Sequence, residues 1–98
     1  MAPKDEGDEL APLGADEERS FMLLPNPAAE RTQVVLSFVP EDAVELRLLD
    51  ITGKAIRQQR MAIAQQRAKL PLDGLAAGVY LVELRSPKFR LVKRLVKH

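Results

Sequence analysis

The stretch that most constrains the fold of this chain runs from Leu72 to Leu84 and reads LDGLAAGVYLVEL. Gly74 and Gly78 supply the backbone freedom that a tight corner needs. Leu75 between them is apolar, and we expect its side chain to pack into the core. After the second glycine the residues are β-branched, aromatic or aliphatic, as in a half-buried strand. Tyr80 stands at the strand entry, where its ring can be buried while its hydroxyl reaches back to a backbone group. This stretch predicts a corner of an antiparallel β-sandwich.

The rest of the chain supplies further strands at the spacing of a sandwich, with turn signals about every 10 residues. In the last of these strands, the alternation of apolar and polar residues slips at Lys93-Arg94, which indicates either a bulge or an edge strand with two packed faces. We expect six or seven strands in all. Those that the pattern predicts directly are Phe21–Leu24, Gln33–Val39, Ala43–Leu49, Val79–Arg85 and Phe89–Lys97.

The segment from Ala55 to Lys69 leaves two alternatives open. Its Ala, Gln, Arg and Met residues favour a helix, and Ile56, Ile63 and Leu70 fall seven residues apart. The competing prediction is a pair of strands, about residues 54–60 and 67–72. Periodicity alone does not separate the two.

Length and charge predict one small domain preceded by an acidic arm. A chain of 98 residues supports a single modest core. Residues 1–20 carry seven acids against two bases, whereas residues 21–98 carry thirteen bases against seven acids. The Pro-, Gly- and acid-rich first segment cannot bury enough apolar surface to offset its ordering entropy, which predicts a flexible linker. The sequence contains neither a signal peptide at its start nor an apolar run near the ~20 residues of a membrane span.

No catalytic constellation stands out in the sequence. The absence of cysteine excludes a disulfide framework, a thiolate metal site and a cysteine nucleophile. The only histidine is the terminal His98, and Asp50 and Asp73 lie at strand-to-turn junctions, where a carboxylate normally accepts turn amides. We therefore expect neither an enzyme nor a cofactor.

Basic residues concentrate in the C-terminal hairpin, and almost no aromatic side chains accompany them. The explanation that we favour for these basic residues is that they are solvated or protect a sheet edge. Binding of a protein or an anionic glycan ranks second, and binding of nucleic acid ranks third. These residues are Arg85, Lys88, Arg90, Lys93, Arg94 and Lys97.

Four motifs in order carry a resemblance to a known family. They are Leu24-Pro25-Asn26-Pro27-Ala28, Leu49-Asp50-Ile51-Thr52-Gly53-Lys54, the Leu72–Tyr80 corner and Arg94-Leu95-Val96-Lys97. Together they resemble the C-terminal sorting domain of type IX secretion cargo from Bacteroidetes, over about residues 21–97. The chain departs from the family's pattern in having Leu24 where an aromatic residue is frequent, in extending to His98, and in its helix-prone segment 55–68.

The resemblance implies a seven-stranded immunoglobulin-like β-sandwich, residues 21–98, that acts as a non-enzymatic secretion signal. An outer-membrane translocon and a shuttle protein would recognise it, and a sortase would cleave the linker, residues 1–20. The cargo would cross the periplasm and reach the cell surface or the extracellular medium, with no membrane insertion and no nucleic-acid partner. For segment 55–68, the resemblance favours strands over a helix. The implied recognition residues are Pro25, Asn26, Pro27, Gly53, Lys54, Gly78, Tyr80, Lys93, Leu95, Val96 and Lys97.

Two alternatives accompany this interpretation. Gly53, Gly78 and Tyr80 are also what any such sandwich needs for its turns and its corner, so their role is equally well explained as structural. The whole chain is alternatively a generic extracellular immunoglobulin-like module for adhesion or carbohydrate binding. That second hypothesis predicts a ligand patch of aromatic residues or a metal, of which the sequence offers little.

Overall fold

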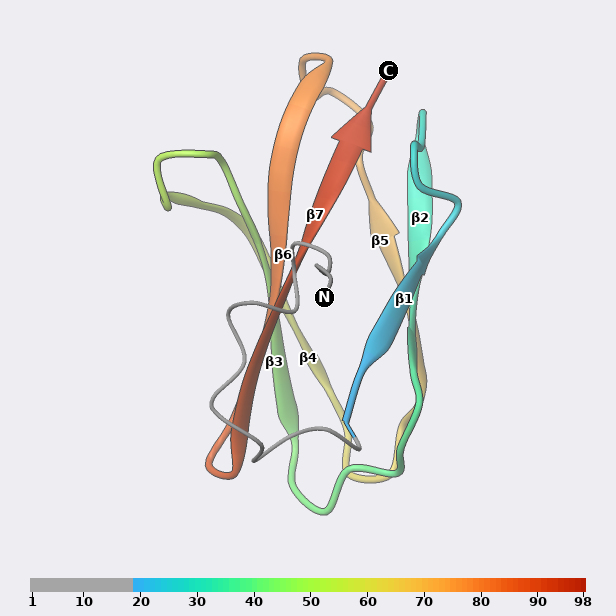
Figure 1. Ribbon diagram of the computed structural model, residues 1–98, viewed down its shortest axis with the longest axis vertical. Helices are drawn as coiled ribbons and strands as arrows, with labels where there is room; N and C mark the ends of the chain where they lie inside the picture. Colours follow the sequence, from blue (N-terminus) through green and yellow to red (C-terminus); the bar gives the residue numbers. More distant parts are fainter. Residues whose placement is uncertain (1–18) are drawn as a thin grey trace, which may run out of the picture.

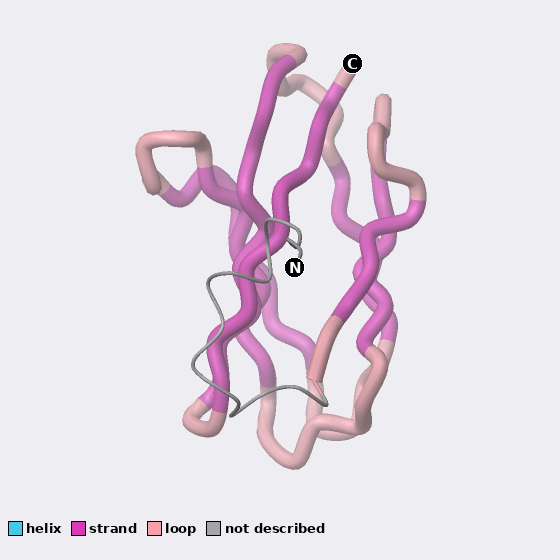
Figure 2. Tube along the Cα trace, in the orientation of Figure 1, coloured by secondary structure: helices cyan, strands magenta, loops and turns pink. Residues whose placement is uncertain are grey.

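The computed structural model describes residues 19–98, which form a sandwich of two antiparallel sheets (Figures 1 and 2). Nearly all of the predicted linker, residues 1–18, lies outside this described part. The described residues contain no helix, and hence none that could cross a membrane. One sheet has the order β1-β2-β5 and the other β4-β3-β6-β7. The strands are β1 (Phe21–Leu24), β2 (Arg31–Leu36), β3 (Val44–Leu49), β4 (Ala55–Met61), β5 (Arg67–Pro71), β6 (Gly78–Ser86) and β7 (Phe89–Lys97).

The core lies between the two sheets and is filled by alternate residues of each strand. On β3, Val44, Leu46 and Leu48 have no exposed surface, while Glu45 between them is exposed. This is the two-residue period that a strand with one buried face requires. The all-β sandwich predicted from the sequence is confirmed.

Segment 55–71 forms strands and not a helix, but the two strands do not pair with each other. β4 is hydrogen-bonded to β3 and β5 to β2, so they belong to opposite sheets. The seven-residue spacing marks no common face, because Ile56 and Ile63 are 37% and 64% exposed while Leu70 is buried. Helix propensity is overridden here because pairing with β3 and β2 turns alternate side chains of each strand inward, with Met61 and Leu70 fully buried.

Side chains of β4 close this side of the sandwich. The Arg57 guanidinium donates hydrogen bonds to the carbonyls of Pro71 and Asp73, at 2.9 and 2.8 Å. The Gln59 amide donates to the Lys69 carbonyl at 2.7 Å. The Lys69 and Pro71 carbonyls belong to β5, an edge strand that would otherwise offer them to another chain.

Two strands, β2 and β7, differ most from the sequence prediction. β2 begins at Arg31 and ends at Leu36, because the chain bends after Leu36 and places the Phe38 ring against the Phe89 ring. β7 contains no bulge: its register with β6 is continuous from Gly78 opposite Lys97 to Ser86 opposite Phe89. The slip in alternation instead reflects an edge strand in which adjacent residues, Leu91 and Val92, are both buried.

The corner before β6 has the predicted arrangement. The Tyr80 ring is buried and its hydroxyl donates a hydrogen bond of 2.6 Å to the Ala76 carbonyl. Leu75 is partly buried and packs against the core cluster. Gly78 has a φ of +153°, which side-chain-bearing residues rarely adopt, and an added Cβ would meet no atom within 4 Å. Backbone conformation, and not lack of space, therefore calls for glycine at this position.

Replacing Tyr80 by phenylalanine tests the corner. The ring stays, but the Ala76 carbonyl loses its donor, so we expect the free energy of unfolding to fall by about 1 kcal/mol. Urea denaturation followed by circular dichroism measures this difference. Equal stability of the variant and the parent chain would show that the hydrogen bond contributes nothing.

Candidate functional site

The predicted recognition residues fall into two separate places, and the larger group surrounds the end of β7. Asn26 contacts this strand with both atoms of its amide group. Its Nδ2 donates to the Arg94 carbonyl at 2.9 Å, and its Oδ1 accepts from the Val96 amide at 3.0 Å. The Pro-Asn-Pro motif and the C-terminal motif, 68 to 70 residues apart in the sequence, thus form one structural unit.

Backbone pairing extends this contact beyond Asn26. The Ala28 amide donates to the Val96 carbonyl, and the His98 amide donates to the Ala28 carbonyl, both at 2.9 Å. Ala28 and Lys97 form an isolated parallel bridge. Residues 26–28 therefore cover the outer edge of β7 at its C-terminal end, where an edge strand would otherwise present unpaired backbone groups.

A buried threonine holds the same loop from inside. Thr32 is 1% exposed, and its hydroxyl donates to the Pro25 carbonyl at 2.7 Å. The peptide bonds before Pro25 and Pro27 are both cis. The two proline rings and Asn26 are exposed, whereas Ala28 is buried. The amide of Asn26 is already used within the domain, so the proline rings are the part of the motif that faces outward.

The other side of β7 is paired with β6. Gly78 lies opposite Lys97, Val79 opposite Val96 and Tyr80 opposite Leu95. Leu95 has no exposed surface, which places it in the core. Val96 and Lys97 are half-buried at the surface. The predicted C-terminal motif therefore combines one core residue with two accessible ones.

Lys93 differs from both the core residue and the accessible residues of the C-terminal motif, because its side chain contacts the other sheet. It is half-buried on β7, and its ammonium group lies 6.0 Å from the centre of the Phe21 ring on β1. A cation over an aromatic face is attracted by the ring quadrupole. Lys93 therefore helps to join the edges of the two sheets.

Gly53 and Lys54 lie in the turn between β3 and β4, a separate projection of the molecule (Figure 1). Both are exposed, and Gly53 has a φ of +93°, as predicted for this turn. The Asp50 carboxylate accepts three hydrogen bonds: from the Thr52 hydroxyl at 2.6 Å and from the Thr52 and Lys54 amides at 2.9 and 3.0 Å. These bonds, led by that of the Thr52 hydroxyl, hold the pKa of Asp50 below its ordinary value of 3.8.

This lowered pKa gives the turn a dependence on pH. Because the folded-state pKa lies below the unfolded one, the carboxylate stabilises the turn above about pH 4, and this contribution is lost as the pH falls through the folded-state value. We expect the Thr52 and Lys54 amide resonances to shift below about pH 4 in an NMR titration. In Asp50→Asn these shifts should be absent; if they persist unchanged, another group causes them.

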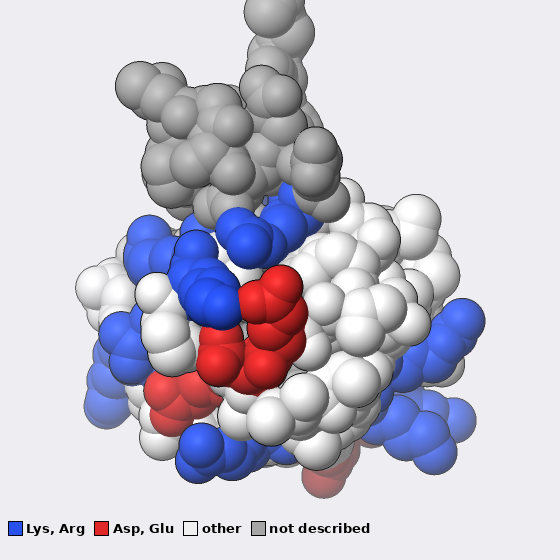
Figure 3. Space-filling model, turned by 90° about the horizontal axis from the view of Figure 1, so that it is seen from below, with Lys and Arg blue, Asp and Glu red and all other residues white. Residues whose placement is uncertain are grey.

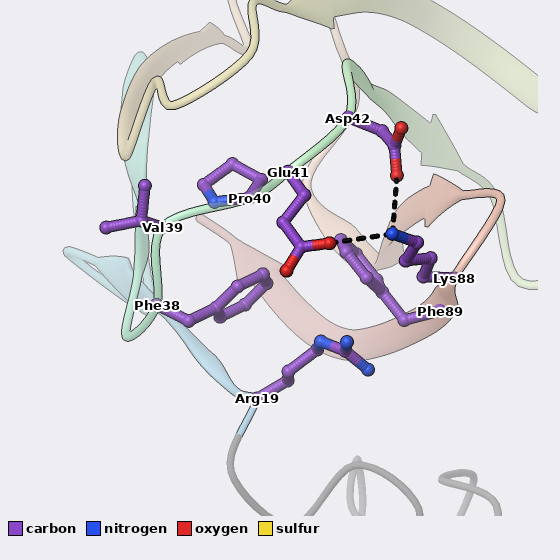
Figure 4. Close-up of a pocket in the computed structure, with 8 residues that line it drawn as sticks. All are labelled: Arg19, Phe38, Val39, Pro40, Glu41, Asp42, Lys88 and Phe89. Carbon is purple, nitrogen blue, oxygen red and sulfur yellow. Dashed lines mark hydrogen bonds and ion pairs between the residues drawn. The ribbon is translucent and has the colours of Figure 1, made fainter.

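A cluster at the lower end of the molecule was not predicted from the sequence (Figure 4). The rings of Phe38 and Phe89 meet edge to face, with centroids 5.1 Å apart. The Arg19 guanidinium lies 5.3 Å from the centre of the Phe89 ring. Lys88 contacts the carboxylates of Glu41 and Asp42, at 2.6 and 3.8 Å. The signal that would have found it is the opposite charge of two Pro-containing turns, Pro40-Glu41-Asp42 and Pro87-Lys88.

The lower cluster lines a pocket of about 240 Å³, but its charges are largely matched. The Lys88 hydrogen bond lowers the pKa of Glu41, and Glu41 raises the pKa of Lys88. In Figure 3, which views this end, acidic side chains lie directly beside basic ones. Among residues 19–98, no group of three or more His, Cys, Asp or Glu side chains could hold a metal ion. The cluster therefore joins Arg19, the first described residue, and two turns of the domain through contacts among its own side chains.

Comparison with known proteins identifies the family. A family model described as a secretion system C-terminal sorting domain matches residues 22–98. A search of curated proteins found no match. The matched segment includes the Pro-Asn-Pro loop, the β3–β4 turn, the corner and the end of β7. The chain therefore belongs to the family of C-terminal sorting domains, the signals that send proteins through the type IX secretion system to the cell surface or the extracellular medium.

Proposed function

We propose that the secretion machinery recognises the surface formed by the Pro-Asn-Pro loop and the end of β7, which we call the tail surface. Its accessible residues include Pro25, Asn26, Pro27, Val96 and Lys97. Family membership makes the domain a type IX sorting signal. On this proposal the domain acts without catalysis, and its partners are an outer-membrane translocon and a shuttle protein that meets the cargo in the periplasm.

The observation that carries this proposal is the double hydrogen bond of Asn26 with β7. Two motifs typical of the family lie in contact although they are far apart in the chain. Their contact fixes the position of the last residues, so that a partner meets an ordered surface and pays little ordering entropy. Leu95 and Tyr80, which are buried, act by holding this surface in place.

The remaining predicted residues have different roles in this proposal. Lys93 positions the end of β7 through its contact with the Phe21 ring on the neighbouring sheet edge, and Gly78 positions it from β6. Gly53 and Lys54 form a separate exposed turn, which would be a second point of contact.

An export assay tests the tail surface directly. Residues 1–98 are fused to the C-terminus of a reporter protein in a host with type IX secretion, and the reporter is measured outside the cell. We expect the parent chain to support export, and removal of Lys97 and His98 to abolish it. This truncation keeps the buried Leu95, so circular dichroism of the purified domain should still show a folded sandwich. Arg60→Glu, on the exposed face of β4, is the control and should export normally.

Unchanged export of the truncated fusion would overturn the proposed role of the tail surface. Failure of the parent fusion to leave the cell in such a host would overturn the proposed function as a whole.

We further propose that a sortase cleaves within residues 1–20. The acidic, Pro- and Gly-rich composition of this segment supports an accessible cleavage region. Mass spectrometry of the exported reporter would place its new C-terminus within residues 1–20. A reporter that retains residues 21–98 would contradict cleavage.

A further inference from the structure

The outer face of the three-stranded sheet combines exposed apolar and basic side chains. Met22 and Leu24 on β1 are 53% and 51% exposed, although both are large apolar residues. The strand register places Met22 beside Val35 and then Arg67, and Leu24 beside Gln33 and then Lys69. Arg31 belongs to the same face, at the end of β2. We call this surface the basic sheet face; its defining residues are Met22, Leu24, Arg31, Val35, Arg67 and Lys69.

None of the outward-facing residues of β1, β2 and β5 is acidic, so these strands place no carboxylate on the face of the three cations. The outer face of the other sheet differs in this respect. There the buried Glu83 carboxylate accepts hydrogen bonds from Arg47 and Arg90, at 2.9 and 2.7 Å. Among the described residues, the outer face of the four-stranded sheet therefore carries two glutamates, Glu45 and Glu83, among its arginines, whereas the three strands of the basic sheet face carry no acidic side chain there.

Protection of a sheet edge does not explain these cations. Arg31 lies on β2, the central strand of its sheet, where no edge needs protection. On the edge strand β5, side chains from elsewhere already occupy the carbonyls: Gln65 donates to Arg67, and Gln59 to Lys69. Edge protection also does not explain why the apolar side chains of Met22 and Leu24 lie half-exposed in line with Arg67 and Lys69 across the strands. Exposed apolar side chains with polar residues around them mark interaction sites, and methionine and arginine are enriched at protein interfaces.

We propose that the basic sheet face docks an acidic protein surface that has apolar side chains among its carboxylates. Arginine binds carboxylates through two parallel hydrogen bonds, which a protein partner can supply at defined positions. An anionic membrane fits less well, because the face has no Trp or Tyr for the lipid interface and only three cations. The face lies on the sheet that does not contain β7, so the inference goes beyond the tail surface and does not depend on it.

An NMR titration of the full chain tests this proposal with a defined probe. The probe is a short soluble peptide that alternates glutamate and leucine, and its lysine–leucine analogue is the reference. We expect the glutamate peptide to produce saturable shifts in the amides of Met22, Leu24 and Arg67, and the lysine peptide to produce none. The double variant Arg31→Glu/Arg67→Glu should bind the glutamate peptide at least about tenfold more weakly, since two charge-assisted contacts are lost.

Two further variants separate the contributions and control for folding. Met22→Ser/Leu24→Ser should weaken binding without altering the charge, because only the apolar contacts are removed. Arg60→Glu changes an exposed cation of β4 in the other sheet and should bind like the parent chain. All variants alter exposed side chains, so equal thermal melting curves would show that the sandwich is intact.

Three results would overturn the proposal. The first is the absence of saturable shifts. The second is equal weakening by Arg60→Glu and by the Arg31/Arg67 variant. The third is co-sedimentation of the chain with phosphatidylglycerol-containing vesicles that the Arg31/Arg67 variant abolishes, which would assign the face to a membrane.

Discussion

Replacing Leu95 by alanine is expected to lower the free energy of unfolding by about 3 kcal/mol. The Leu95 side chain has no exposed surface and lies opposite Tyr80 in the register of β6 and β7. Its removal leaves a cavity between the sheets in addition to the lost burial of apolar surface. Urea denaturation followed by circular dichroism gives the difference in free energy.

Lys97→Ala is the matched control, two residues further along the same strand. Its side chain is half-buried at the surface, so we expect a change within about 0.5 kcal/mol. The pair separates two ways in which a change in the C-terminal motif can stop export. Leu95→Ala should reduce export through loss of folded protein, whereas Lys97→Ala should reduce it while the domain stays folded. Equal destabilisation by the two substitutions would contradict the assignment of Leu95 to the core.

Asn26→Ala is expected to lower the free energy of unfolding by about 2 kcal/mol, because two hydrogen bonds to β7 are lost at about 1 kcal/mol each. The Arg94 carbonyl and the Val96 amide would both lose their partner. Local opening at the end of β7 should therefore become more frequent. Hydrogen exchange by NMR should show faster exchange of the Val96 and His98 amides, with little change in the centre of β6.

Asn26→Asp is a sharper version of the same experiment. The carboxylate still accepts a hydrogen bond from the Val96 amide, but it has no donor for the Arg94 carbonyl and places a negative charge beside it. We expect Asn26→Asp to be destabilised as well, although its shape is nearly unchanged. Gln58→Ala, an exposed amide on β4, is the control and should exchange like the parent chain. Unaltered exchange at Val96 in both Asn26 variants would show that the bridge at Ala28 suffices to hold the tail.

The positions of most strands follow from local sequence. Alternation predicted β3, because Glu45 and Arg47 separate three residues that are buried. The glycines, Leu75 and Tyr80 predicted the corner, since each meets a requirement of the backbone or the core within a few residues. In both places the residues that predict the structure lie within one short stretch of chain, so local sequence was sufficient for the prediction.

The partners of these strands were not predictable in the same way. β4 and β5 follow each other in sequence yet belong to opposite sheets, joined by Arg57 and Gln59 and not by a backbone ladder. Pairing depends on which buried faces meet across the sandwich, and this is a property of the whole chain. The helix propensity of the same segment was likewise overridden by burial.

The sequence alone determined the class of fold, the corner, the turns and the order of four motifs that resemble a family of sorting domains. Only the tertiary structure decided that Asn26 binds the backbone of β7, that Leu95 belongs to the core, and that the cations on the outer face of β1, β2 and β5 share it with no acidic side chain of these strands. The physical reason is that burial, hydrogen-bond partners and charge balance arise where distant segments meet. A residue's type limits which of these contacts it can make, and the packing of the two sheets selects among them.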